Sequence, residues 1–199
     1  MSVSRNIALS AAAALILAAT GAHAAPLAIV NVAAPAINCV FNPSCSVVVT
    51  DSIGRIPNTA PTSLGRLQSR TFSGAPGAPG AGLTGYMYRV DLTSVAGSTA
   101  PLCVSAYKID FGPMASLRYS ANGPPAQVFV VTSGGLGTVG LAGADLTGTV
   151  VTFTFARPVC AGQTSYFFGM AAAPTPVPTD AAILLPGGWT NVDARSAHP

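Results

Sequence analysis

Hydrophobic and polar side chains alternate along several short segments of the 199-residue chain. Residues 86–92 read YMYRVDL, in which two tyrosines, a valine and a leucine occupy even positions while methionine, arginine and aspartate occupy odd ones. The same period of two recurs in residues 105–111 (SAYKIDF) and 149–156 (TVVTFTFA). Because successive side chains of a β-strand point to opposite faces, this pattern predicts three strands with one buried and one exposed face.

Further short apolar segments are predicted to be strands because glycine, proline or polar turn residues bound them. They are residues 27–32, 46–50, 126–132, 138–141, 164–170, 181–185 and 189–194. No convincing helical period of 3.6 residues separates them, although a parallel α/β fold requires one. The pattern therefore predicts an all-β, antiparallel two-sheet β-sandwich, immunoglobulin-like or jelly-roll-like, with a closed β-barrel as the alternative.

Two segments lack this regularity. Residues 51–82 are long, polar and rich in proline, glycine and serine, and we predict an irregular loop there. Residues 171–180 include the proline-rich string APTPVPT, which predicts a linker-like segment. Residues 25–199 are long enough to form one domain with a core of its own, so a single sandwich domain is expected.

The N-terminal residues have the three regions of a secretory signal peptide. Arg5 precedes the uncharged, mostly apolar run 7–20, and the small-x-small tripeptide AHA follows and ends at Ala24. The apolar run is shorter than the about 20 residues that span a bilayer. We therefore predict a signal peptide at 1–24, cleaved near Ala24, and a periplasmic or extracellular protein with no membrane span in its mature chain.

Four cysteines follow the predicted cleavage site, and an even number in an exported chain indicates two disulfides. They are Cys39, Cys45, Cys103 and Cys160. Three pairings are possible. We favour Cys39–Cys45, which brackets the short loop CVFNPSC, together with Cys103–Cys160, which would join two distant strand ends. A zinc site is disfavoured because the spacing is wrong and no histidine lies nearby.

The number and spacing of charged residues limit the classes of binding partner that can be expected. Charged residues make up 8% of the chain, against about 25% in a typical soluble domain. The positive charges are mostly single arginines with no basic run between them, so the sequence gives no indication of nucleic-acid binding. The expected partner is a protein or a polysaccharide.

Catalytic groups are sparse. His198 is the one histidine beyond the predicted signal peptide, and its place next to the C-terminus predicts a frayed side chain unsuited to a Ser-His-Asp or Cys-His site. A pair of carboxylates is the other candidate, because glycoside hydrolases work with two. The candidates, none of them in a recognisable acid/base motif, are Asp51, Asp91, Asp110, Asp145, Asp180 and Asp193.

Cofactor and metal motifs are weak as well. Residues 135–140 (GLGTVG) match the dinucleotide pattern G-x-G-x-x-G, but neither a helix nor an acidic residue about 20 positions on follows. We predict a glycine-rich hairpin turn there, and no cofactor. Calcium stays an open alternative at the loops around Asp51 and Asp145, each of which offers a single carboxylate.

Most aromatic side chains have the parity of core residues. Trp189, and Tyr119 near a turn at residues 122–124, are the two rings most free to be exposed. We expect them to be the ligand contacts if the domain binds carbohydrate by stacking on sugar rings.

Residues 88–171 resemble a family of exported β-rich proteins from proteobacteria for which no activity is known. The most distinctive string is VFVVTSGGLGTVG, at residues 128–140. The resemblance implies an exported β-rich fold and transfers no functional residue.

The sequence favours a secreted, non-enzymatic structural or interaction module. A carbohydrate-binding module acting through Trp189 or Tyr119 is the first alternative, and an aspartate-based hydrolase is the second. Retention on a polysaccharide column or convergence of two aspartates in one cleft would separate these hypotheses.

Overall fold

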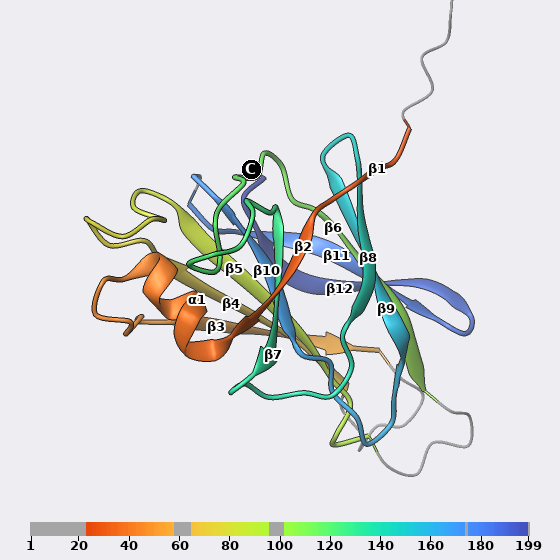
Figure 1. Cartoon of the computed structure of the whole chain (residues 1–199). Helices are drawn as coiled ribbons and strands as arrows, with labels where there is room; N and C mark the ends of the chain where they lie inside the picture. Colours follow the sequence, from red (N-terminus) through yellow and green to blue (C-terminus); the bar gives the residue numbers. More distant parts are fainter. Residues whose placement is uncertain (1–22, 58–64, 96–101, 174, 199) are drawn as a thin grey trace, which may run out of the picture.

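The computed structural model describes residues 23–57, 65–95, 102–173 and 175–198, so most of the predicted signal peptide lies outside the described residues (Figure 1). The fold is all-β, with two six-stranded sheets that do not close into a barrel. The prediction of a two-sheet sandwich is therefore confirmed. No helix in the described part of the chain is long and apolar enough to cross a membrane.

Sheet A contains, in spatial order, β1 (Ala25–Pro26), β8 (Leu141–Thr147), β9 (Val150–Cys160), β6 (Cys103–Asp110), β11 (Val177–Leu185) and β12 (Gly188–Ser196). Sheet B contains β2 (Ile29–Ala33), β7 (Val128–Ser133), β10 (Phe167–Ala172), β5 (Thr84–Asp91), β4 (Gly65–Ser73) and β3 (Thr50–Ile56). Neighbouring strands are antiparallel except β2 and β7, which pair in parallel and make sheet B mixed.

The core lies between the inner faces of the two sheets. The alternation in the sequence identifies it correctly, because the predicted inward residues of β5, β6 and β9 are all buried. Tyr107 of sheet A packs against Tyr88 and Phe168 of sheet B, with ring centroids 5.2 and 6.0 Å apart. Tyr88 also donates a 2.6 Å hydrogen bond to the carbonyl of Arg195, which satisfies its buried hydroxyl.

Both favoured disulfides are present. Cys103 and Cys160 are register partners on β6 and β9, so this bond joins neighbouring strands of sheet A. Cys39 and Cys45 close a short loop at the end of a helix, residues 34–41, that is described below. Two disulfides are compatible with a protein that folds outside the reducing cytosol.

The predicted irregular loop at residues 51–82 is wrong, because β3 and β4 occupy most of the residues that the structure describes in this range. Irregular backbone remains at residues 74–83, and the strand predicted at 46–50 begins only at Thr50. In β4 the inward positions after Leu67 are Ser69 and Thr71, both buried. Small hydroxyl side chains at core positions hide the alternation, which explains why the sequence pattern failed here.

The helix α1 (Ala34–Phe41) was also not predicted. Pro35 lies in its first turn, where the missing N–H costs nothing. Ile37, Val40 and Phe41 are buried, and they pack on the outer face of sheet B in a second hydrophobic cluster. Figure 1 shows α1 on this face, beside β4 and β7.

Two smaller predictions also need correction. The proline-rich segment 171–180 is not a plain linker, since β10 extends to Ala172 and β11 starts at Val177. The glycine-rich string after β7 does not form a hairpin turn, because β7 belongs to sheet B and the next strand, β8, belongs to sheet A. This segment therefore crosses from one sheet to the other.

Candidate functional site

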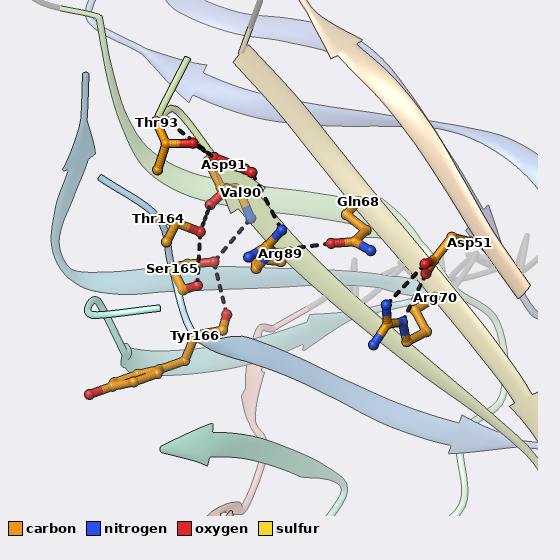
Figure 2. A network of polar contacts seen from close by, with 10 residues as sticks. All are labelled: Asp51, Gln68, Arg70, Arg89, Val90, Asp91, Thr93, Thr164, Ser165 and Tyr166. Carbon is orange, nitrogen blue, oxygen red and sulfur yellow. Dashed lines mark hydrogen bonds and ion pairs between the residues drawn. The ribbon is translucent and has the colours of Figure 1, made fainter. Parts of the chain in front are cut away.

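Arginine side chains gather on the outer face of sheet B. The antiparallel register places Arg70 of β4 opposite Asp51 of β3, and Arg89 of β5 opposite Gln68 of β4. Because these residues share one parity, their side chains project from the same face of the sheet. Figure 2 shows them as a network of polar contacts across β3, β4 and β5.

Arg70 forms a two-point ion pair with Asp51. Its Nε donates to Oδ1 at 2.8 Å and its Nη2 donates to Oδ2 at 2.9 Å. The hydrogen bonds from Arg70 lower the pKa of Asp51 below its ordinary value and so keep the carboxylate ionised. This geometry fixes the plane of the Arg70 guanidinium on the sheet surface.

Arg89 is held by two different acceptors. Its Nε donates to Gln68 Oε1 at 3.2 Å, and its Nη2 lies 3.4 Å from Asp91 Oδ2. Asp91 also accepts hydrogen bonds from the backbone N–H and the hydroxyl of Thr93. Burial works to raise the pKa of Asp91, but the Thr93 hydrogen bonds and the nearby arginine charges outweigh it and lower this pKa.

Both guanidinium groups lie over the ring of Phe167 on β10. The Cζ atoms of Arg70 and Arg89 are each 5.0 Å from the ring centroid. Cation–π attraction to a shared ring, added to the acceptors described above, leaves each guanidinium little conformational freedom. A ligand that binds here therefore meets donors that are already ordered, which lowers the entropy cost of binding.

A groove with a volume of about 480 Å³ runs over these residues, a size typical of small-molecule sites. Its lining combines the two arginines and two amides with a majority of apolar side chains. The full set is Ala34, Ile37, Asn38, Val47, Val49, Gln68, Arg70, Phe72, Met87, Arg89, Val131, Gly134, Gly135, Leu136 and Phe167. Strands of sheet B form its base, while α1, the segment after α1 and the glycine-rich string form its walls.

Hydrogen bonds behind the groove fix β5 to the segment that leads into β10. The Val90 N–H donates to Ser165 Oγ at 3.0 Å, and Thr164 Oγ1 donates to the Val90 carbonyl at 2.9 Å (Figure 2). Gly137 lies against the same segment with φ +114°, and a Cβ there would come within 2.1 Å of the Ser165 carbonyl. Glycine is thus required where the groove wall returns to the sandwich.

The two predicted aromatic contacts have different outcomes. Trp189, at the start of β12, is 43% exposed on sheet A, and Lys108 Nζ lies 4.3 Å from its ring centroid. The expected exposure of Tyr119 is wrong, because this residue is fully buried and packs against Phe129 with the centroids 4.8 Å apart. The chain after β6 folds back over sheet B through a bridge between Ala115 and Ala171, which covers the ring and which no local pattern announces.

Three of the six candidate aspartates come together. Asp180 and Asp193 are register partners on β11 and β12, and together with Asp110 they line an open cavity of about 720 Å³. This meets the condition that the sequence analysis sets for an aspartate-based hydrolase, so that function stays an alternative prediction. Asp51 and Asp91 are held in the arginine network, and Asp145 lies on β8. Among the described residues, no group of three or more histidine, cysteine or acidic side chains is arranged to hold a metal ion.

His198 is not frayed, contrary to the prediction. Its Nδ1 lies 3.6 Å from Asp110 Oδ2, and its backbone N–H donates to Ser196 Oγ at 3.2 Å. The Ser196 hydroxyl in turn donates to the His198 carbonyl and is therefore bonded to the histidine backbone rather than to its ring. These contacts hold the C-terminal residues against the sandwich.

The arginine groove is not apparent from the sequence. Its cationic residues, at positions 70 and 89, are separated in the chain and have the pattern of isolated charges. The signal that would reveal them is the alternation in GRLQSRTFS of β4, where Arg66, Gln68 and Arg70 share one face. That segment lies within the wrongly predicted loop, so its outward face was not considered.

No protein-family model, curated protein or solved structure matches the chain. The resemblance of residues 88–171 to exported proteobacterial proteins stays a prediction, and the case for a function rests on the geometry of the groove.

Proposed function

We propose that the chain is an exported, non-enzymatic binding module whose groove holds an anionic group such as a carboxylate. The observation that carries the proposal is the placement of Arg70 and Arg89, each 5.0 Å from the centre of the Phe167 ring, in one groove. Planar guanidinium groups bind carboxylates through paired hydrogen bonds, and ordering them in advance favours binding.

A surplus of positive charge on this face supports the proposal. On the outward positions of β3, β4 and β5, the described residues include four arginines and two aspartates, which leaves two net positive charges. The arginines are Arg55, Arg66, Arg70 and Arg89. An anion approaching this face is attracted, and the attraction weakens as salt is added.

Export is part of the proposal and has two supports. The N-terminal residues have the order of regions found in signal peptides, and the chain carries two disulfides of the kind that persist in oxidising compartments. N-terminal sequencing of the protein recovered from the periplasm or medium of an expressing bacterium should begin near Ala25.

The test is a titration of the oxidised protein with carboxylates, followed by the rise in melting temperature that binding to the folded state produces. We expect a saturable rise in the parent protein that is lost in Arg89→Gln. The matched control is Arg157→Gln, which removes the same charge from sheet A and should keep the rise. Equal responses of both variants and the parent, or no response at all, would overturn the proposal.

Carbohydrate binding at Trp189 is a second candidate, favoured by the partial exposure of that ring on sheet A. Lys108 lies over the ring at 4.3 Å and competes with a sugar for it. Retention on a polysaccharide column that disappears in Trp189→Ala, but not in Arg89→Gln, would establish this function in place of the first.

A further inference from the structure

The groove offers more than positive charge, because apolar side chains continue from the arginines along its walls. Ile37 of α1, Val47 and Val49 of the segment after α1, and Leu136 of the glycine-rich string all line it. A small hydrophilic anion would leave this apolar surface in contact with water. A ligand with an apolar part would remove it from water, which is the dominant favourable term in binding.

Two of these wall residues leave apolar side chains exposed beside the groove, and adjoining exposed apolar surface can mark a ligand-binding groove. Leu136 is 60% exposed and Val49 is 39% exposed. Leu136 is flanked by Gly135 and Gly137, so no neighbouring side chain in the sequence covers it. The two residues come from different loops and border the same groove.

The arginines leave donors for a ligand. Arg70 uses Nε and Nη2 for Asp51, and Arg89 uses Nε and Nη2 for Gln68 and Asp91. In the described part of the chain, no hydrogen bond from either Nη1 group is present to compete with a bound carboxylate. Each guanidinium carries five N–H donors in total, so both can hold their present partners and accept a ligand as well.

We infer that the ligand of this groove is a single-chain anionic amphiphile, with its carboxylate on Arg70 and Arg89 and its hydrocarbon tail along Val47, Val49 and Leu136. The inference rests on the proposed function, since it names the ligand class of the same site. Charge complementarity selects the sign of the head group, and the apolar walls select the tail.

The test is a series of linear carboxylates from acetate to decanoate, titrated calorimetrically below their micelle-forming concentrations. Each methylene group that enters the groove should tighten binding by about three- to fourfold until the tail outgrows the walls. Octyltrimethylammonium has a comparable tail with a positive head and should bind at least tenfold more weakly than octanoate.

Three variants separate the contributions. Leu136→Ser should flatten the dependence on chain length, and Arg89→Gln should weaken the binding of every carboxylate. The matched control is Ile53→Ser, because Ile53 is an exposed apolar residue (50%) that does not line the groove. It should leave the whole series unchanged.

The outcomes distinguish the inference from the function on which it rests. If acetate, octanoate and an oligouronate bind with equal, Arg89-dependent affinity, the groove binds anions and the amphiphile inference is wrong. If octyltrimethylammonium binds as well as octanoate, the anionic head is wrong and the proposed function fails with it. If none of these ligands binds at millimolar concentration, both are wrong.

Discussion

The two sheets have similar inner faces but different outer faces. Inside, aromatic and aliphatic side chains from both sheets form one core. Outside, sheet A carries β9 threonines and the Trp189–Lys108 pair. Sheet B is partly covered by α1 and by the chain after β6, and it carries arginines on the outward faces of β3, β4 and β5. The comparison teaches that alternation determines which face of a strand is buried, while the residues on the opposite face and the elements laid over it determine where a ligand can bind.

Removing the disulfides should give the largest difference in stability between the two sheets. The Cys103–Cys160 bond of sheet A closes a loop with a sequence separation of 57, so replacing both cysteines by serine should lower the free energy of unfolding by about 4 kcal/mol. The Cys39–Cys45 bond has a separation of 6 and should contribute about 2 kcal/mol. Denaturant unfolding under oxidising conditions measures both changes.

For the affinity for octanoate, the two disulfides should have the opposite order of importance. The short disulfide closes the loop that leads from α1 into the groove wall, so Cys39→Ser/Cys45→Ser should weaken binding several-fold. The sheet A variant Cys103→Ser/Cys160→Ser should bind normally wherever it is folded. Equal losses of affinity in both double variants would contradict a groove on sheet B alone.

Replacement of Phe167 should have the next largest effect, on the affinity for octanoate. Phe167→Leu should weaken octanoate binding about tenfold, since both guanidinium groups lose their aromatic partner. The cost in stability should stay below the about 3–5 kcal/mol of a Phe→Ala replacement, because leucine refills part of the space. Phe153→Leu in the core of sheet A is the control. It should cost comparable stability and leave the affinity for octanoate as it was.

Like-charge pairs on both sheets should give smaller effects. Arg55 faces Arg66 on sheet B, and Asp180 faces Asp193 on sheet A. Arg55→Gln and Asp193→Asn should each raise the free energy of unfolding by about 0.2–1 kcal/mol at low ionic strength. In 1 M salt the gains should disappear, because exposed charges are screened. A gain that persists in high salt would mean that repulsion is not its cause.

The smallest expected effect is the pH dependence of stability that arises from the two aspartates bound by arginines. The folded pKa values of Asp51 and Asp91 lie below their ordinary value of 3.8. Their stabilising contribution is therefore fully present above the unfolded pKa, and it is lost as the pH falls through the folded pKa. Asp51→Asn should reduce the loss of stability between pH 5 and 2. An unchanged pH profile would show that the ion pair with Arg70 does not contribute.

Much of the sandwich can be predicted from the sequence, but the groove cannot. The clean alternation of β5, β6 and β9 follows directly from apolar inward positions, and the cysteine spacing favours the observed pairing. The buried Ser69 and Thr71 of β4 lack that contrast, so the sequence of the strand that carries Arg70 resembles that of a loop. Alternation in the sequence shows only whether a side chain is polar. Whether a small hydroxyl side chain is buried depends on neighbours that are distant in the chain.

The groove also depends on elements that local patterns do not place. The helix α1 is eight residues long and its apolar side chains match those of a strand, so only its packing on sheet B distinguishes it. Likewise, the burial of Tyr119 results from the chain crossing the outer face of sheet B. Neither α1 nor the burial of Tyr119 can be predicted from local patterns, because both depend on which segments pack on the outer face of sheet B in the tertiary structure.

Anion binding in the groove is best tested by NMR of the arginine Nε–H resonances during an octanoate titration. The Nε–H signals of Arg70 and Arg89 should shift saturably and together, while those of Arg118 and Arg157 stay in place. If all four signals shift alike, or if none shifts while the protein remains folded, the groove on sheet B is not an anion-binding site.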